Sequence, residues 1–349
     1  MWEERADHAR REITALASSG LGLSELHAEA IRVIGRDVST ELTCWATLDP
    51  ETLVISAMAS GDARIPSHFE PFLADAEYSP GEPHSFATMA RRHQSLARMS
   101  ELPRQQHELS GRYRNVWKPL GLTQELRVLF LSDGACWGAG GLVRAGADFT
   151  DREVDYLRGV APAVAQATRL AVRTELSDRH VMSPPAIAVL GADGSIRSAT
   201  EGARLWQARL DDIAPNRFLV MMRILALGAH AAASGAFRVR VRDATGQWAL
   251  MQASRLRGGD GADEVAVSID AASGEQLTSM LLIAYGLSPR ERDVCRDVIA
   301  GLSTAEIATH LFVTTNTVQD HLKSVFAKVD VRSRGELVAR LQPQPAVSE

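Results

Sequence analysis

The chain has 349 residues, of which 45% are hydrophobic and 23% are charged, and its formal net charge is −5 at pH 7. This length allows two or three domains with a core each, and the composition is that of an ordinary globular protein. The net charge excludes a general attraction to nucleic acid or to an anionic membrane. No apolar run is long enough to cross a membrane, and the charged N-terminus is unlike a signal peptide. We therefore expect a cytoplasmic protein without membrane contact.

Residues 1–180 are predicted to form an α+β domain. A helix is expected over 24–38, because the apolar residues there recur at helical spacing. Four strands are predicted as two hairpins, over residues 42–48, 53–59, 125–131 and 135–143. The segment between the hairpins, 65–111, is polar and rich in His, Arg and Pro, so we expect helix and loop there.

A long helix is expected to close this domain. Thr150 and Glu153 have the spacing of a capping box, in which each side chain binds the other residue's backbone amide, and the apolar pattern continues towards Leu176. The order helix, hairpin, irregular crossover, hairpin, helix resembles a GAF domain, a small sensor module of bacterial regulators. The cyclic-nucleotide signature of some GAF domains is not visible, so the resemblance implies no particular ligand.

A second α+β unit is predicted over residues 184–272, after a Pro-containing linker. Its strands are expected over residues 186–190, 196–199, 237–242, 248–254 and 264–269. Helices are expected over 200–210 and 218–233. Strand, Asp-Gly turn, strand, helix and a three-strand meander resemble a PAS domain. The alternative is that the last strands complete a structural linker unit.

The C-terminal segment from Leu287 to Leu341 contains three Ser–Glu pairs at a spacing of three residues. They are Ser288 with Glu291, Ser303 with Glu306, and Ser333 with Glu336. Each pair predicts a capping box at the start of a helix, and Pro289 suits the first helical position of the first of them. The segment therefore predicts a small all-helical domain.

Another helix in this segment is expected to start at Thr314 or Thr315 and to run to Lys328. Its apolar residues form one stripe, made of Val318, Leu322, Val325, Phe326 and Val329. No carboxylate lies in its first turn, so its N-terminal amides and the helix dipole are free to meet a phosphate. Only a short turn separates it from the helix expected over 304–311, which is the arrangement of a helix-turn-helix.

The segment also contains a set of short motifs. They are Leu287-Ser288-Pro289-Arg290-Glu291-Arg292, Gly301-Leu302-Ser303, Glu306-Ile307-Ala308, Thr317-Val318, His321-Leu322, Phe326-Ala327-Lys328, Val331-Arg332-Ser333-Arg334 and Glu336-Leu337. Together they resemble the LuxR-type, or NarL/FixJ-type, DNA-binding domain of bacterial response regulators. The resemblance implies a four-helix bundle over 277–343 whose third helix enters the major groove and whose fourth helps to pair two protomers. Residues 344–349 are expected to be a disordered tail.

The polar side of the helix that starts at Thr314 or Thr315 carries the candidate DNA contacts. The residues expected to meet base edges are Asn316, Gln319, Asp320 and Lys323. The residues expected to hold phosphates are Thr315, Thr317, Ser324 and Lys328. Members of the family commonly have a basic residue where this chain has Gln319, and often a neutral one in place of Asp320. Residues 277–341 contain eight Lys and Arg against seven Asp and Glu, so weak binding that needs a dimer, or a target-specific set of base contacts, is expected.

The motifs of common enzymes and cofactor sites are missing from the sequence. There is no P-loop, no His-Glu-x-x-His, no Gly-x-Ser-x-Gly and no Cys-x-x-Cys. Lys118-Pro119 occurs as a pair in phosphoacceptor receiver domains, but the acidic pair that such domains need is not found at the strand ends. The three cysteines, Cys44, Cys136 and Cys295, lie far apart, which favours packing over a disulfide, metal or redox role. We therefore expect no enzymatic activity, no cofactor and no metal.

These patterns predict a multidomain protein in which α+β sensor domains, GAF-like and then PAS-like, precede an all-α four-helix LuxR-type helix-turn-helix domain. The predicted function is a transcription regulator that binds double-stranded DNA as a homodimer under the control of its sensor modules. RNA polymerase and an unknown small-molecule effector are candidate further partners. The alternative is a ligand-binding sensor whose helical domain contacts a protein such as RNA polymerase rather than DNA.

Overall fold

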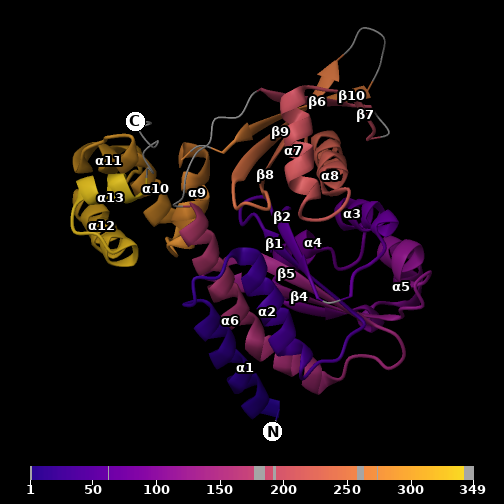
Figure 1. The fold of residues 1–349 in the computed structure, drawn as a ribbon. Coiled ribbons are helices and arrows are strands. Elements are labelled where there is room, and N and C mark those ends of the chain that lie inside the picture. Colours follow the sequence, from indigo (N-terminus) through magenta and orange to yellow (C-terminus); the bar gives the residue numbers. More distant parts are fainter. Residues whose placement is uncertain are drawn as a thin grey trace. The chain divides into compact units, whose positions relative to one another are not determined.

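The computed structural model describes residues 2–61, 63–176, 185–191, 194–257, 263–272 and 274–341. The chain divides into two compact units, Met1–Ala171 with Met182–Ala271, and Val172–Val181 with Ala272–Glu349. The first contains two antiparallel sheets and the second contains the C-terminal helices (Figure 1). The expected combination of two sheet-containing parts and a helical C-terminal part is confirmed. The predicted tail, 344–349, lies outside the described residues.

The first sheet has the strand order β2-β1-β5-β4-β3. Its strands are β1 (Leu42–Leu48), β2 (Ile55–Ser60), β3 (Leu96–Arg98), β4 (Gln124–Ser132) and β5 (Ala135–Arg144). Four of them match the predicted hairpins. β3 was not predicted, because three residues inside a polar segment show no alternation, and only its pairing with β4, where Leu96 faces Val128, defines it.

Helices cover one face of this sheet (Figure 1). They are α1 (Trp2–Leu16), α2 (Leu23–Gly35) and α6 (Asp151–Leu176), and the predicted box of Thr150 and Glu153 opens α6. Trp45 of β1 is completely buried, and its ring packs against Phe130 of β4 with 4.7 Å between centroids. Gly140 of β5 makes room for it, because a Cβ there would lie 3.0 Å from the Trp45 ring.

The segment between the two hairpins forms short elements. They are the 3₁₀ turn Ser67–Phe69, α3 (Glu70–Tyr78), α4 (Phe86–Arg91), the 3₁₀ turn Met99–Glu101, α5 (Arg104–Leu109) and the π-helical turn Tyr113–Trp117. The expectation of helix and loop is confirmed apart from β3. Buried ion pairs hold this segment to the sheet: Arg112 lies 2.9 Å from Glu82 and 3.2 Å from Glu125, and Arg127 lies 2.6 Å from Glu77.

The second sheet has the order β7-β6-β10-β9-β8, which is the order of the first sheet when each is counted from its own first strand. Its strands are β6 (Ala186–Leu190), β7 (Ile196–Ala199), β8 (Ala236–Arg242), β9 (Trp248–Arg257) and β10 (Asp263–Ala271). Helices α7 (Glu201–Asp211) and α8 (Arg217–Ala231) pack on it and bury Trp206 and Phe218. All five strands and both helices match the predictions.

Ion pairs join the two sheets within the first unit. Arg240 of β8 lies 2.8 Å from Asp49 and 2.7 Å from Glu51, both in the turn after β1. Asp49 is completely buried, so removal of Arg240 would leave an uncompensated carboxylate in the interior. Arg223 of α8 pairs with Asp75 of α3. The two sheets are therefore parts of one compact unit rather than independent bodies.

The second unit contains α9 (Gly274–Ala284), α10 (Pro289–Ile299), α11 (Thr304–His310), α12 (Thr315–Val329) and α13 (Arg334–Leu341). α9 was not predicted as a helix. The capping boxes at Ser288 and Ser303 are confirmed. The third box is wrong in one half: Glu336 donates its amide to Ser333 as expected, but its carboxylate accepts the amide of Arg332 at 2.8 Å. The carboxylate still satisfies an amide before α13, one residue earlier than predicted.

Candidate nucleic-acid interface

The helix α12 begins with a hydroxyl cap. Thr314 accepts the amide of Thr317 at 3.2 Å, and no acidic residue lies in the first turn. A neutral cap of this kind leaves the positive end of the helix dipole unopposed. The N-terminus of α12 is therefore electrostatically suited to an anion such as a phosphate.

One side of α12 builds the core of the domain. Val318, Leu322, Val325 and Val329 are buried, and Phe326 is half-buried. These are the members of the predicted apolar stripe, and they pack α12 against α10 and α11. The packing fixes which side of α12 faces outward.

The outward side carries the four residues predicted to meet base edges. Asn316, Gln319, Asp320 and Lys323 are all exposed and, at this spacing, form a single stripe along the helix. The Lys323 ammonium lies 3.7 Å from the Asp320 carboxylate, and both side chains are more than three-quarters exposed, at 80% and 77%. Such a surface pair contributes little to stability, so both groups are free to rearrange towards a ligand.

The residues predicted to hold phosphates fall into two groups. Thr315 is exposed at the start of α12, and the Thr317 hydroxyl lies 2.9 Å from that of Thr314. Ser324 and Lys328, in contrast, are already bound inside the domain: their side chains donate to the two carboxylate oxygens of Glu291, at 2.6 and 2.7 Å. Their phosphate contacts stay a prediction, and in this structure the two side chains lock α12 onto α10.

Glu291 is a residue whose role in the interface was not predicted from its capping box. Its carboxylate also accepts the amide of Ser288 at 2.7 Å, and the residue is only 5% exposed. Burial raises the pKa of Glu291, but the hydrogen bonds from Lys328, Ser324 and Ser288 together lower it to about 2. The carboxylate is therefore charged at neutral pH, and it positions the helix that carries the candidate base contacts.

The turn between α11 and α12 presents a further side chain that sequence reasoning missed. Phe312 has a positive φ of 55° and is 95% exposed. A single aromatic residue in a turn gives no periodic signal, so only the structure shows that it points away from the core. Nearby, His310 of α11 lies 2.8 Å from Asp297 of α10, and Arg334 of α13 binds the carbonyl of Leu302 and the hydroxyl of Thr304. These contacts fix α11 against its neighbours.

Comparison with known proteins shows to which family the helical domain is similar. Residues 286–341, which span α10 to α13, match the model of the bacterial regulatory proteins of the luxR family. A stretch of 55 residues is 34% identical to the spore germination protein GerE of Bacillus subtilis and covers 74% of that protein and 16% of this chain. The chain belongs to the LuxR family of bacterial regulatory proteins.

Other matches differ in how much of the chain they cover. A putative HTH-type transcriptional regulator of Mycobacterium tuberculosis is 54% identical over 52 residues, which are 15% of this chain and 6% of that protein. This chain thus spans a small fraction of the length of the mycobacterial relatives. The VqmA–ligand–DNA complex of Vibrio cholerae matches 45% of this chain and 80% of its own at 12% identity, with a TM-score of 0.22, too low for any conclusion about fold.

Two further properties concern the part of the chain that the structure describes. No helix in it combines the length and the hydropathy that crossing a membrane requires. No group of three or more His, Cys, Asp or Glu side chains in the same residues is placed to hold a metal ion. In this LuxR-family chain, the outward stripe of α12 is the candidate site that the helical unit offers.

Proposed function

We propose that the chain is a cytoplasmic transcription regulator that binds double-stranded DNA as a homodimer, with α12 of each copy in the major groove. Asn316, Gln319, Asp320 and Lys323 are the proposed base contacts, and Thr315, Thr317, Ser324 and Lys328 the proposed phosphate contacts. The two sheets of the first unit act as GAF-like and PAS-like sensor modules that control this binding.

The outward stripe of α12 is the observation that carries the proposal. Amide side chains such as Asn316 and Gln319 suit adenine, Lys323 suits guanine or a phosphate, and Asp320 suits the amino group of cytosine. All four are exposed on a helix whose opposite side is buried, so they are presented without any change of fold. Membership of the LuxR family also supports the proposal that α12 binds DNA.

The near-neutral charge of the helical unit favours a second candidate. Eight basic and seven acidic residues between 277 and 341 give little attraction to phosphates in general. The same surface would suit a protein partner such as RNA polymerase, which is the alternative function. A binding experiment on random DNA separates the two, because a protein-contacting stripe selects no DNA sequence.

The test is selection from a random double-stranded DNA library with the full chain, followed by titration of the enriched site. We expect a two-fold symmetric motif whose half-sites lie about one helical turn apart. Gln319→Ala should relax the preference at one position in each half-site and cost about 1–3 kcal/mol on the preferred site. Lys323→Ala should weaken DNA binding. The salt dependence of the affinity shows whether Lys323 meets a base or a phosphate, because a lost phosphate contact reduces the slope of log affinity against log salt concentration by about one.

Gln207→Ala is the matched control, because Gln207 is an exposed glutamine on α7, outside the helical unit. It should leave both the motif and the affinity unchanged. A library that yields no enriched sequence, or a Gln319→Ala chain with the footprint and affinity of the unchanged protein, would contradict the proposal.

A further inference from the structure

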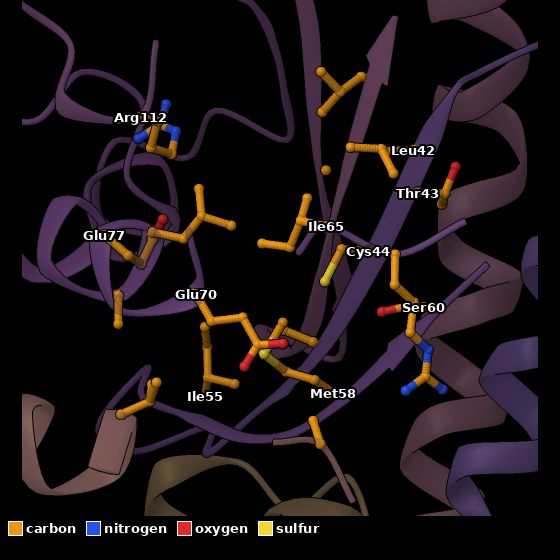
Figure 2. A pocket seen from close by; sticks show the side chains of 18 of the residues that line it. Leu42, Thr43, Cys44, Ile55, Met58, Ser60, Ile65, Glu70, Glu77 and Arg112 are labelled. Atoms are coloured by element: carbon orange, nitrogen blue, oxygen red, sulfur yellow. The ribbon is translucent and has the colours of Figure 1, made fainter. Parts of the chain in front are cut away.

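A cavity of about 180 Å³ lies inside the first unit, between the first sheet and the helices α3 and α8. Figure 2 shows Ile55, Met58, Ile65 and the thiol of Cys44 around one space, with the carboxylate of Glu70 turned towards it. Val220 and Ile224 of α8 add apolar surface from the second sheet's module. An apolar cavity of about 150 Å³ already accepts a benzene-sized ligand, so this one has room for a small organic molecule.

Arg217 is the exceptional residue of this cavity. It lines the cavity from the first turn of α8 and is 3% exposed. Its Nε and one of its terminal nitrogens are buried without a hydrogen-bond acceptor, and among the described residues no carboxylate lies within ion-pair distance of it. Burial lowers the pKa of the Arg217 guanidinium, while the nearby groups of Tyr78, Cys44 and Glu70 raise it. An unpaired buried cation is costly, and proteins rarely keep one without a reason.

The buried arginines that the first sheet's module contributes to this cavity differ in this respect. Arg112 and Arg127 also line the cavity, but each pairs with a buried glutamate of the same module. Burial raises the pKa of Glu70 and the charge of Arg217 lowers it, but among the described residues the two side chains form neither an ion pair nor a hydrogen bond. The cavity therefore contains one positive charge that its own residues leave without an anionic partner.

A second polar group is available beside this charge. Tyr78 lines the cavity, and its hydroxyl accepts the amide of Ile55 at 2.9 Å. Its own proton has no acceptor among the described residues. Arg217 and Tyr78 are thus two lining residues with unused donors, while most of the remaining wall is apolar.

We propose that this cavity binds a small monocarboxylate with an apolar body, and that Arg217 receives the carboxylate. A single guanidinium matches a carboxylate in a two-pronged pair, and the presence of Glu70 disfavours a ligand of higher negative charge. Because Arg217 belongs to α8 and most of the wall belongs to the first sheet's module, the ligand is held by both modules at once. The inference goes beyond DNA binding and does not depend on it.

The test is calorimetric titration of the full chain, without DNA, using sodium benzoate, phenylacetate and 4-methylpentanoate, with benzamide as the neutral counterpart of benzoate. At least one carboxylate should bind with one site per chain, and benzamide should bind roughly 10- to 100-fold more weakly than benzoate, which is what the loss of a charged hydrogen bond costs. Arg217→Met should abolish the preference for the carboxylate. Tyr78→Phe should weaken carboxylate binding and leave benzamide binding unchanged.

Thermal unfolding separates a ligand-binding role of Arg217 from a structural one. Without ligand, Arg217→Met should raise the midpoint of unfolding, because it removes an unpaired buried charge and keeps an apolar stem of similar length. Arg204→Met, at an exposed arginine of α7, is the matched control and should change neither the midpoint nor the titrations. Failure of all three carboxylates to bind, equal binding of benzoate and benzamide, or benzoate binding that Arg217→Met leaves unchanged would each overturn the proposal.

Discussion

His27 shows at the scale of one residue how burial fixes a protonation state. It is 2% exposed, its ring packs edge-on to Trp45, and its Nε2 lies 2.9 Å from the Thr168 hydroxyl. That hydroxyl donates its proton to the carbonyl of Val164, so Nε2 of His27 must carry a proton and donate it. The ring is therefore held as the neutral Nε2–H tautomer between α2, α6 and β1.

This environment predicts a pH dependence. Burial, with the nearby charge of Arg242, lowers the pKa of His27 from 6.5 to about 4. The unfolded chain thus binds a proton before the folded one, so stability is lost as the pH falls from 6.5 towards 4, by up to about 3 kcal/mol. His27→Gln keeps a donor but does not titrate, so it should flatten this part of a plot of unfolding free energy against pH.

His8→Gln is the control for that experiment, because the His8 side chain is 72% exposed. It should leave the pH dependence as it is. A His27→Gln chain that loses as much stability between pH 6.5 and 4 as the unchanged protein would show that His27 is not the group responsible.

At the scale of an element, two glutamates show that a residue which caps the start of a helix can also position a neighbouring helix. Glu291 and Glu306 occupy the same place in the capping boxes of α10 and α11. Glu306 is exposed and, among the residues that the structure describes, hydrogen-bonds only with Ser303, whereas Glu291 also binds Ser324 and Lys328 of α12. The same local motif therefore has a purely local role in one helix and a tertiary role in the other.

Replacement of each glutamate by glutamine should separate these roles. At pH 7, Glu291→Gln should lower the opening free energy of α12 by about 3 kcal/mol, the equivalent of its pKa shift from 4.5 to about 2, and hydrogen exchange of the α12 amides measures this. The difference should shrink as the pH falls from 4.5 towards 2, because the stabilisation exists only while the folded carboxylate is charged. Glu306→Gln should leave α12 unaffected, and equal effects of the two changes would contradict this account.

At the scale of the whole molecule, the charge balance makes pairing of two copies the expected source of affinity. A helical unit with one excess basic residue between 277 and 341 gains little from phosphate contacts alone. We expect α13 to contribute to the pairing, and Ala339 is exposed on it. Ala339→Glu should shift the sedimentation of the full chain from dimer to monomer and weaken binding to the selected DNA site at least about tenfold.

Ala208→Glu on α7 is the matched control, since Ala208 is also an exposed alanine in a helix and the added charge is the same. It should leave the sedimentation and the DNA affinity unchanged. A chain that sediments as a monomer before any substitution and still binds its site with full affinity would refute the dimer.

The sequence by itself determined most of the helices and strands, and it indicated the family of the helical unit. Apolar patterns and turns located nine of the ten strands found in the described residues, and capping pairs located the starts of α6, α10 and α11. These signals are local, because a cap or a strand alternation involves residues close in the chain. β3 was not predicted because it is too short to show a pattern, and α9 was also not predicted.

Only the tertiary structure decided which of these residues work together. Glu291 reaches Ser324 and Lys328 across 33 and 37 positions of the chain, and Arg217 lines a cavity whose wall comes mostly from residues more than a hundred positions earlier. No spacing in the sequence predicts such contacts, because they depend on how whole elements pack. For the same physical reason, the polar stripe of α12 could be predicted from its helical period, whereas the carboxylate that holds that stripe in place, and the unpaired charge in the cavity, could not.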